Sequence, residues 1–434
     1  MIISSEKSEK KSWWILGIIF ASQFLSQKIN LVLIIWCFLY FLALGGLKLQ
    51  CSFPGRMVYF YLFLCGLLAG ILNLNDLNHS IYSYFKHLYY FILVFLYWII
   101  GCQIVRYKRI THKTIIVTLT FASVAYSMYD LVSAAIKLSS GEAASLYQYR
   151  NMIGNGSFLS MIGIYLLLFY RRELSYGRRK FICSFLICLF SFLIHFSRTL
   201  FIELFILLIF SGIKVNLSKL SRLLLILLAA LLAVYIISPD MTLNFVNKIY
   251  RSALEINFRN DEWTQTTITQ NWRGYEVYCE LLRFKDSGFL EKLFGGGFGT
   301  TLDVLGYAYL VTQENTLPFL HNGYYTQLMI WGVLGVVGFF IWGVQVYKCG
   351  SSLRHQQDRH LVKGMAVIIL VITYFIMGPF FSMNVAVYLF YIALFYMVSV
   401  VNKASETHDE GNGDSLYRNA CKESSNVINT GRIP

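Results

Sequence analysis

The stretch IYSYFKHLYYFILVFLYWIIG, residues 81–101, carries one Lys and one His among side chains that are mainly aliphatic or aromatic. An α-helix rises about 1.5 Å per residue, so about 20 residues cover the hydrocarbon core of a bilayer. Strands of a membrane barrel are about half as long and alternate apolar with polar residues. The stretch therefore predicts a membrane-spanning α-helix.

The composition of the whole chain extends this prediction. Of the 434 residues, 56% are hydrophobic and 14% are charged, and the mean hydropathy is +0.56. A soluble domain carries about 25% charged residues, because its surface must stay dispersed in water. These values exclude a soluble globular protein. They predict an all-α integral membrane protein, in which the helices satisfy their own backbone hydrogen bonds inside lipid.

Apolar runs of about 20 residues predict about twelve transmembrane helices. A long polar segment separates the ninth run from the tenth. We therefore expect nine membrane helices in 1–238, one large outer loop in 239–320, three membrane helices in 321–401 and a disordered cytoplasmic tail in 402–434. The predicted spans are 13–27, 30–47, 57–73, 81–101, 114–137, 152–170, 180–196, 199–213, 221–238, 322–346, 362–379 and 382–401.

The net charge of +14 follows this topology. With twelve spans both termini lie on one side, and every loop on that side carries Lys or Arg, whereas the short loops opposite carry few. Cytoplasmic loops are enriched in Lys and Arg, so both termini are predicted to be cytoplasmic. The basic excess then orients the chain and implies no nucleic-acid partner. The basic loops lie within 7–11, 48–56, 106–113, 171–180, 214–222 and 348–363.

Few basic residues remain for the outer side, and these are the candidates for chemistry. They are Arg150, Arg198, Arg273 and His321. Arginine presents a planar fork that matches phosphate oxygens, and histidine can take a proton near neutral pH. Arginines that neutralise a pyrophosphate make it a good leaving group, so this chemistry needs no metal or other cofactor. The nine cysteines lie mostly in apolar runs, without metal-ligand spacing.

Each candidate also has a structural interpretation. Arg198 can snorkel to the interface, Arg150 can be an ordinary loop residue, and His321 can pack at a helix start. Glu203 can pair with Arg198, although five residues is a poor spacing for an intrahelical pair. Glu203 and Lys86 are the charged residues expected deep in the membrane. His87 and His195 are expected to pack or to pair.

The outer loop contains a predicted helix over Arg273–Phe284, followed by the glycine-rich run LFGGGFG at 293–299. Residues 241–258 have the apolar spacing of a helix on the bilayer surface. No Lys-Ser or Lys-Thr follows the glycines, so they do not form a Walker loop. The run predicts a tight turn, and its amides are an alternative contact for phosphate.

Three motifs in this order resemble the O-antigen polymerase and O-antigen ligase superfamily. HNGYYTQLMIWGVLGVVG at 321–338 has its His-Asn start and Gly-x-x-Gly continuation. Arg273-Gly-Tyr-Glu before the glycine turn resembles its loop arginine, and Ser197-Arg198-Thr199 resembles the motif that opens a middle span. The chain departs from the superfamily at Ile330 and Trp331, where an acidic residue is common.

The resemblance implies a GT-C-like, metal-independent, inverting glycosyltransferase at the outer face of the bacterial cytoplasmic membrane. Its donor would be an undecaprenyl-pyrophosphate-linked glycan. A chain-length regulator and a repeat-unit flippase would be partners. The implied roles are catalysis by His321 and pyrophosphate binding by Arg198 and Arg273. To these we add Arg150 as a substrate-binding candidate and Asn322, Glu203, Gly297 and Gly299 as supporting residues.

The leading functional hypothesis is a polymerase that joins lipid-linked repeat units into O-antigen, capsular or exopolysaccharide. A ligase that transfers the glycan to lipid A-core would share the same donor chemistry. A flippase or secondary transporter is a hypothesis of another class, and it predicts charged residues along a path through the membrane.

Overall fold

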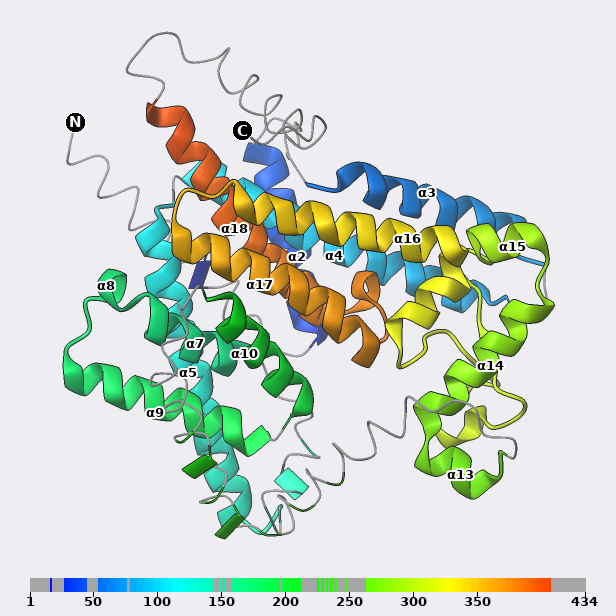
Figure 1. The fold of residues 1–434 in the computed structure, drawn as a ribbon, viewed down its shortest axis with the longest axis horizontal. Helices are drawn as coiled ribbons and strands as arrows, with labels where there is room; N and C mark the ends of the chain where they lie inside the picture. The colour runs from blue at the N-terminus through cyan, green and yellow to red at the C-terminus, as the bar shows by residue number, and fades with distance from the viewer. Residues whose placement is uncertain are drawn as a thin grey trace. The chain divides into compact units, whose positions relative to one another are not determined.

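The computed structural model is predominantly helical, with one two-stranded sheet among the described residues (Figure 1). The chain divides into two compact units. Unit 1 comprises Met1–Leu47, Gln103–Tyr250 and Arg354–Gly364, and unit 2 comprises Lys48–Cys102, Arg251–Leu353 and Met365–Pro434. The described residues are 16–17, 27–44, 54–75, 79–108, 110–143, 145, 148–149, 152, 158–195, 197–211, 225, 228–229, 232, 235–236, 239, 243, 247 and 263–406.

Four helices in the described part of the chain are long and apolar enough to cross a membrane. Their candidate spans are Ile81–Arg106, His112–Ser139, Gly323–Ser351 and Met383–Val401. They belong to α4 (Ile81–Lys108), α5 (His112–Ser139), α16 (Gly323–Ser351) and α18 (Met383–Glu406). The prediction of an all-α membrane protein is confirmed at this level, and these helices match the fourth, fifth, tenth and twelfth predicted spans.

Most of the remaining predicted spans correspond to shorter helices or lie mostly outside the described residues. Apolar helices too short for this criterion occur at Leu31–Leu44, Arg56–Leu72 and Phe158–Phe169, in the second, third and sixth predicted spans. The seventh corresponds to α9 (Arg178–His195), which begins with three basic residues, and the eighth to α10 (Arg198–Phe210), which has 13 residues. The first and ninth spans, and the surface helix expected at 241–258, lie almost entirely outside the described residues.

The predicted eleventh span is interrupted. The helix α17 runs over Gln356–Ile372 and continues into the short turn η2 (Thr373–Phe375). Gly378 then has φ 134°, and Pro379 opens a second short turn, η3 (Pro379–Phe381). Glycine permits this conformation and proline cannot continue a helical hydrogen-bond ladder, so the helix ends before residue 379, the predicted end of the span.

Unit 1 is built around the short helix α7 (Phe158–Phe169), whose residues from Phe158 to Leu167 are all buried. It packs against α5, α9 and α10, and α5 also packs against α9. A Cβ added at Gly163 would lie 2.7 Å from Ser123 Cβ and 3.0 Å from Cys188 Sγ, so the missing side chain allows this close approach. The short helix α8 (Arg171–Leu174) follows α7, and α2 (Gln27–Leu44) also belongs to this unit.

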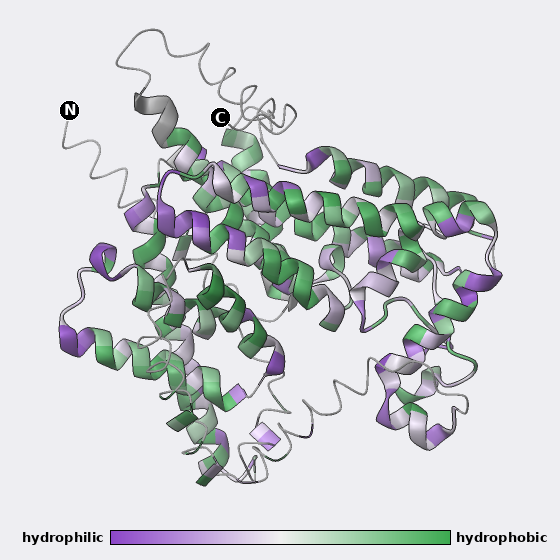
Figure 2. Ribbon diagram, viewed as in Figure 1, coloured by the Kyte–Doolittle hydropathy of each residue, from purple (hydrophilic) through white to green (hydrophobic). Residues whose placement is uncertain are grey.

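Unit 2 combines the helices α3 (Arg56–Leu72), α16 and α18 with the described part of the outer loop. The loop contains α13 (Gln265–Gln270), α14 (Trp272–Asp286), α15 (Phe289–Phe294) and η1 (Ala308–Leu310). Strands β1 (Leu302–Asp303) and β2 (Thr316–Leu317) pair antiparallel, with Leu302 opposite Leu317. The helix predicted over Arg273–Phe284 is thus confirmed as α14. Figure 2 shows hydrophobic residues along α3 and α16 and more hydrophilic ones on α13 and α14.

The glycine turn at 295–299 is confirmed, and it is inserted among the helices of unit 2. Gly295, Gly297 and Gly299 have φ values of 72°, 83° and 96°, which other residues rarely adopt. Between them, the fully buried Phe298 contacts an aromatic cluster. The ring contacts of Phe298 are with Phe63, Tyr84, His87, Phe91 and Trp331.

The turn also donates hydrogen bonds to two carbonyl groups at a kink in α16. At Gly332 the backbone has φ 62° and ψ −160°, so the carbonyls of Met329 and Ile330 lose the helical donors they would otherwise have. Instead they accept hydrogen bonds from Gly296 N–H at 3.0 Å and Gly297 N–H at 2.9 Å. The kink and the turn therefore depend on each other.

Gly70 of α3 tests this packing. An added Cβ would stand 2.3 Å from the Phe298 carbonyl oxygen. Alanine is the better helix former, yet we expect Gly70→Ala to lower the free energy of unfolding by about 1–3 kcal/mol, because backbone atoms must shift. Thermal unfolding of the detergent-solubilised protein measures the change.

The matched control is Gly338→Ala in α16, where the nearest atom to an added Cβ is 3.5 Å away. It should match or exceed wild-type stability, by up to about 1 kcal/mol. Equal melting temperatures for Gly70→Ala and the wild type would contradict the proposed packing of the turn.

Candidate functional site

The candidate site lies where the first turns of α14 and α16 meet in unit 2 (Figure 1). Asn271 begins α14 by accepting a hydrogen bond from Gly274 N–H at 3.1 Å. Asn322 begins α16 in the same way, accepting from Tyr324 N–H at 3.1 Å. Asparagine is favoured at this position because its side chain satisfies an amide at the helix start. The Asn of the His-Asn motif thus fixes the start of α16, directly after His321.

His321 forms a pair with Glu276. The imidazole Nδ1 lies 2.8 Å from Glu276 Oε1, and the His321 backbone N–H donates to Glu276 Oε2 at 2.8 Å. Because a carboxylate only accepts, Nδ1 carries a proton, and in the neutral imidazole the lone pair is then on Nε2. The His321 side chain is 36% exposed, whereas that of Glu276 is 1% exposed. The pair therefore joins a buried carboxylate to a partly exposed imidazole.

Glu276 is itself held in place. Its Oε1 also accepts a hydrogen bond from the indole Nε1 of Trp272, one turn earlier in α14. A buried carboxylate is costly unless donors surround it, and these donors together meet that requirement. Arg273 lies three residues before Glu276, so the two side chains are neighbours on one face of α14, with Cβ atoms about 5–6 Å apart. Arg273 is half-buried.

A second ionic group fixes α14 further along the helix. Arg283 forms two hydrogen bonds to the buried Glu280, at 2.8 and 2.9 Å, and pairs with Glu291 of α15. Its Nη2 also lies 3.5 Å from the Met329 carbonyl oxygen of α16. This group ties α14 and α15 to the kink region of α16, and so supports the position of Glu276.

The amides of the glycine turn are all used within the protein. Each N–H from Gly295 to Thr300 donates to a protein acceptor, including Gly297 to Ile330 and Gly299 to Nδ1 of His87. The alternative in which these amides contact phosphate therefore has no free donor in this turn. His87 Nε2 also donates to the Pro318 carbonyl at 2.8 Å, so the expected pairing role of His87 is confirmed.

Other predicted site residues belong to unit 1. Arg198 is half-buried at the start of α10, where Ser197 is the residue before the helix, and Glu203 is buried in its second turn. The sequence Ser197-Arg198-Thr199 thus marks a break between α9 and α10. Arg150 lies outside the described residues. His321, Asn322, Arg273, Gly297 and Gly299 belong to unit 2.

Four carboxylates that the sequence did not single out are buried among the described residues: Asp130, Glu276, Glu280 and Asp358. One is Glu276, for which the only signal was its place one turn after Arg273. Another is Asp130 in α5, so Glu203, which is buried as expected, is not the only buried acidic residue of the membrane helices. Asp130 Oδ2 accepts from Ser191 at 2.7 Å and lies 3.0 Å from His195 Nε2, and its Oδ1 accepts from Tyr149 at 3.1 Å. The expected pairing of His195 is confirmed.

Comparison with known proteins adds no family assignment. No protein-family model matches the chain, and no curated protein matches it.

Removing the positive partner of Glu280 tests the support of α14. Burial raises the pKa of Glu280 above 4.5, and Arg283 opposes this rise. In Arg283→Met the pKa should rise further, so the folded state binds its proton more tightly than the unfolded state. The variant should be most stable below about pH 4.5 and lose stability as the pH rises through the folded pKa. At pH 8 we expect a loss of about 3–5 kcal/mol relative to wild type.

The measurement is thermal or denaturant unfolding between pH 4.5 and 8. Glu280→Gln combined with Arg283→Met removes the uncompensated charge and should abolish the pH-dependent part of the deficit. A deficit of equal size at every pH would show that the loss of Arg283 acts through packing alone.

Proposed function

We propose that this protein is a membrane glycosyltransferase that polymerises undecaprenyl-pyrophosphate-linked oligosaccharide repeat units. The observation that carries the proposal is the His321–Glu276 pair, a histidine oriented by a buried carboxylate. The resemblance to the O-antigen polymerase and ligase superfamily supplies the substrate class. The proposal also adopts twelve spans in a GT-C-like arrangement, with both termini in the cytoplasm of a bacterial cell.

In the proposed reaction His321 acts as the general base. A hydroxyl of the acceptor sugar attacks the anomeric carbon of the donor, while its proton passes to Nε2 of His321. The bond between the anomeric carbon and the pyrophosphate oxygen breaks as the new glycosidic bond forms, so the configuration inverts. Glu276 holds the tautomer and stabilises the imidazolium that develops, as a carboxylate does in other histidine-dependent enzymes. Glu276 acts through His321 and is a positioning residue.

Arg273 is proposed to bind the pyrophosphate of the donor. It lies on the same face of α14 as Glu276, and guanidinium groups bind phosphate oxygens in a bidentate manner. The charge that develops on the leaving pyrophosphate would be stabilised there without a metal ion. Arg198 and Arg150 stay proposed as substrate-binding residues, on the basis of the outer-face prediction and the motif at Ser197-Arg198-Thr199.

A ligase that transfers the same donor glycan to lipid A-core would use the same chemistry. Reconstitution in liposomes with one defined lipid-linked repeat unit separates the two. A ladder of repeat units supports the polymerase. Transfer only when lipid A-core is added supports the ligase and contradicts the polymerase.

Substitutions at the pair test the mechanism. His321→Ala should lower kcat by about 100- to 10,000-fold, the usual contribution of a general base. Glu276→Gln should lower kcat with little effect on KM, because the histidine loses its orientation and its charge partner while substrate contacts remain. Arg273→Ala should raise KM as well as lower kcat.

The assay is repeat-unit transfer by purified protein in liposomes, normalised to folded protein. Lys285→Ala is the matched control, since it removes an exposed basic side chain from the same helix. Wild-type rates in both His321→Ala and Arg273→Ala would contradict the proposal.

A transporter remains the second candidate because of Asp130. A carboxylate buried in a candidate membrane span and paired with His195 is the kind of group that lines ion pathways. For the polymerase, we expect Asp130→Asn to retain repeat-unit transfer per folded protein. Translocation of the lipid-linked substrate without bond formation, lost in Asp130→Asn, would instead support a transporter.

A further inference from the structure

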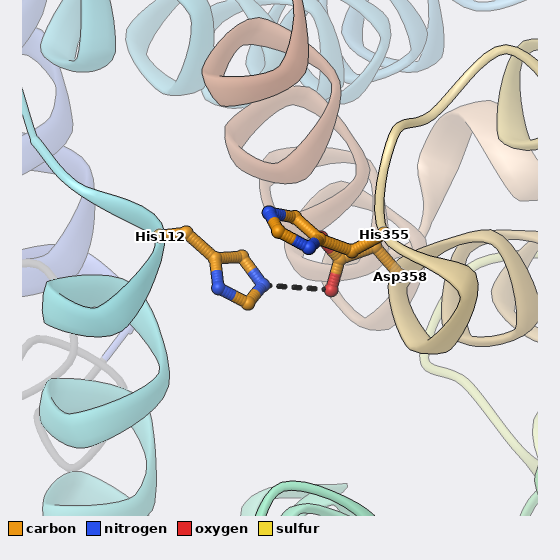
Figure 3. Close-up of side chains that lie close together, drawn as sticks. All are labelled: His112, His355 and Asp358. Carbon is orange, nitrogen blue, oxygen red and sulfur yellow. Dashed lines mark hydrogen bonds and ion pairs between the residues drawn. The ribbon is translucent and has the colours of Figure 1, made fainter. Parts of the chain in front are cut away.

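Three side chains outside the proposed reaction site converge in unit 1. His112 is the first residue of α5, while His355 and Asp358 lie just before and within the first turn of α17 (Figure 3). One ligand atom from each of the three lies within 4.8 Å of the others. The two imidazole rings stack, with centroids 4.5 Å apart and an interplanar angle of 23°.

The carboxylate of this cluster is buried and oriented. Asp358 Oδ1 lies 2.9 Å from His112 Nε2 and accepts a hydrogen bond from the Tyr170 hydroxyl at 2.8 Å. Both bonds end on Oδ1. Gln357 Nε2 donates to the Phe169 carbonyl at 3.3 Å, which fixes the first turn of α17 against the end of α7. The ligands are thus held by contacts that do not involve a metal.

A second carboxylate, that of Glu173, lies near Tyr170. It acts on Tyr170 electrostatically, and its Oε2 is buried with no hydrogen-bond partner among the described residues. An ordinary His–Asp ion pair needs neither a second histidine nor another carboxylate nearby. The cluster therefore brings two imidazoles and one buried carboxylate to the same place.

We propose that His112, His355 and Asp358 bind one divalent first-row transition-metal ion, of which Zn²⁺ is the representative. Two imidazole nitrogens and one carboxylate oxygen form a common ligand set for Zn²⁺ and Fe²⁺ sites with a water-filled fourth position. The ligand atoms of a tetrahedral Zn²⁺ site lie about 3.3 Å from one another. Side-chain rotations that move these atoms by about 1.5 Å are enough to reach that separation. Calcium and magnesium prefer oxygen ligands and fit this set poorly.

Metal binding would replace a hydrogen bond that is already present in the cluster. The His112–Asp358 hydrogen bond gives way to bonds from both groups to the metal, and any proton on the two imidazoles is released. Tyr170 keeps its bond to the carboxylate and becomes the outer partner that orients it. The ion would link the start of α5 to the start of α17 within unit 1. The inference does not rest on the proposed reaction, to which none of the three residues is assigned.

The test is metal binding by the full-length protein, purified in detergent with a tag that contains no histidine. After treatment with a chelator, the protein is titrated with Zn²⁺, and bound metal is counted by mass spectrometry. We expect one Zn²⁺ per chain and a higher melting temperature when it is bound. Co²⁺ in place of Zn²⁺ should give the visible absorption of a four-coordinate site.

Variants assign the ligands. His112→Ala, His355→Ala and Asp358→Asn should each lose the stoichiometric site. Tyr170→Phe should weaken binding by about 10-fold, because it removes only the outer hydrogen bond. His360→Ala is the matched control, since His360 lies in α17 outside the cluster and should leave binding unchanged. Melting curves without metal show whether each variant is folded.

Two results would overturn the proposal. The first is a wild-type protein that binds no stoichiometric Zn²⁺ after chelation and reloading, which leaves a hydrogen-bonded pair only. The second is folded His112→Ala and His355→Ala proteins that bind Zn²⁺ as tightly as the wild type.

Discussion

Unit 2 depends on the docking of one glycine turn against a kinked helix. The kink at Gly332 frees two carbonyls of α16, and in an apolar interior such groups must find donors. Gly296 and Gly297 supply them. Side chains at this contact are excluded by space as well as by backbone conformation, since a Cβ at Gly297 would lie 2.0 Å from the Gly70 nitrogen. Phe298 then fills the aromatic interior between α3, α4 and α16.

The docking of the glycine turn also affects the candidate site, because α14 and α15 connect the two. The turn follows α15 directly, and Arg283 joins α14 to Glu291 of α15 and approaches the carbonyl of Met329. The position of α14 relative to the first turn of α16 is therefore set by polar contacts at both ends. At the far end those contacts are the Glu280–Arg283 group, and at the near end they are Glu276, Trp272 and His321. A site assembled on two helix starts is more rigid than one carried by a free loop.

Charged groups are sparse in this chain, and many of the buried ones occur in pairs or clusters. Glu276 pairs with His321, Glu280 with Arg283, Asp130 with His195, and Asp358 with His112. Burying an uncompensated charge is expensive, which explains why each carboxylate has a positive or polar partner. Three of the four partners are histidines, so proton and metal chemistry are both within reach of these clusters. The pairs differ in their exposure to solvent. The imidazole of His321 is partly exposed, whereas that of His195 is buried between helices.

Sequence by itself determined the helical membrane class, the long spans in α4, α5, α16 and α18, the helix α14 and the tight turn at 295–299. Each depends on a local run of residues or on the conformational freedom of glycine. The earlier end of the eleventh span could also have been predicted from Gly378-Pro379. Only the tertiary structure decided which carboxylate meets which histidine, because Glu276 and His321 lie 45 positions apart and Asp130 and His195 lie 65 apart. Hydropathy and residue spacing contain information about neighbours within one helix or strand. A buried pair of this kind forms only when two such elements pack together, because each buried charge needs a partner on the other element.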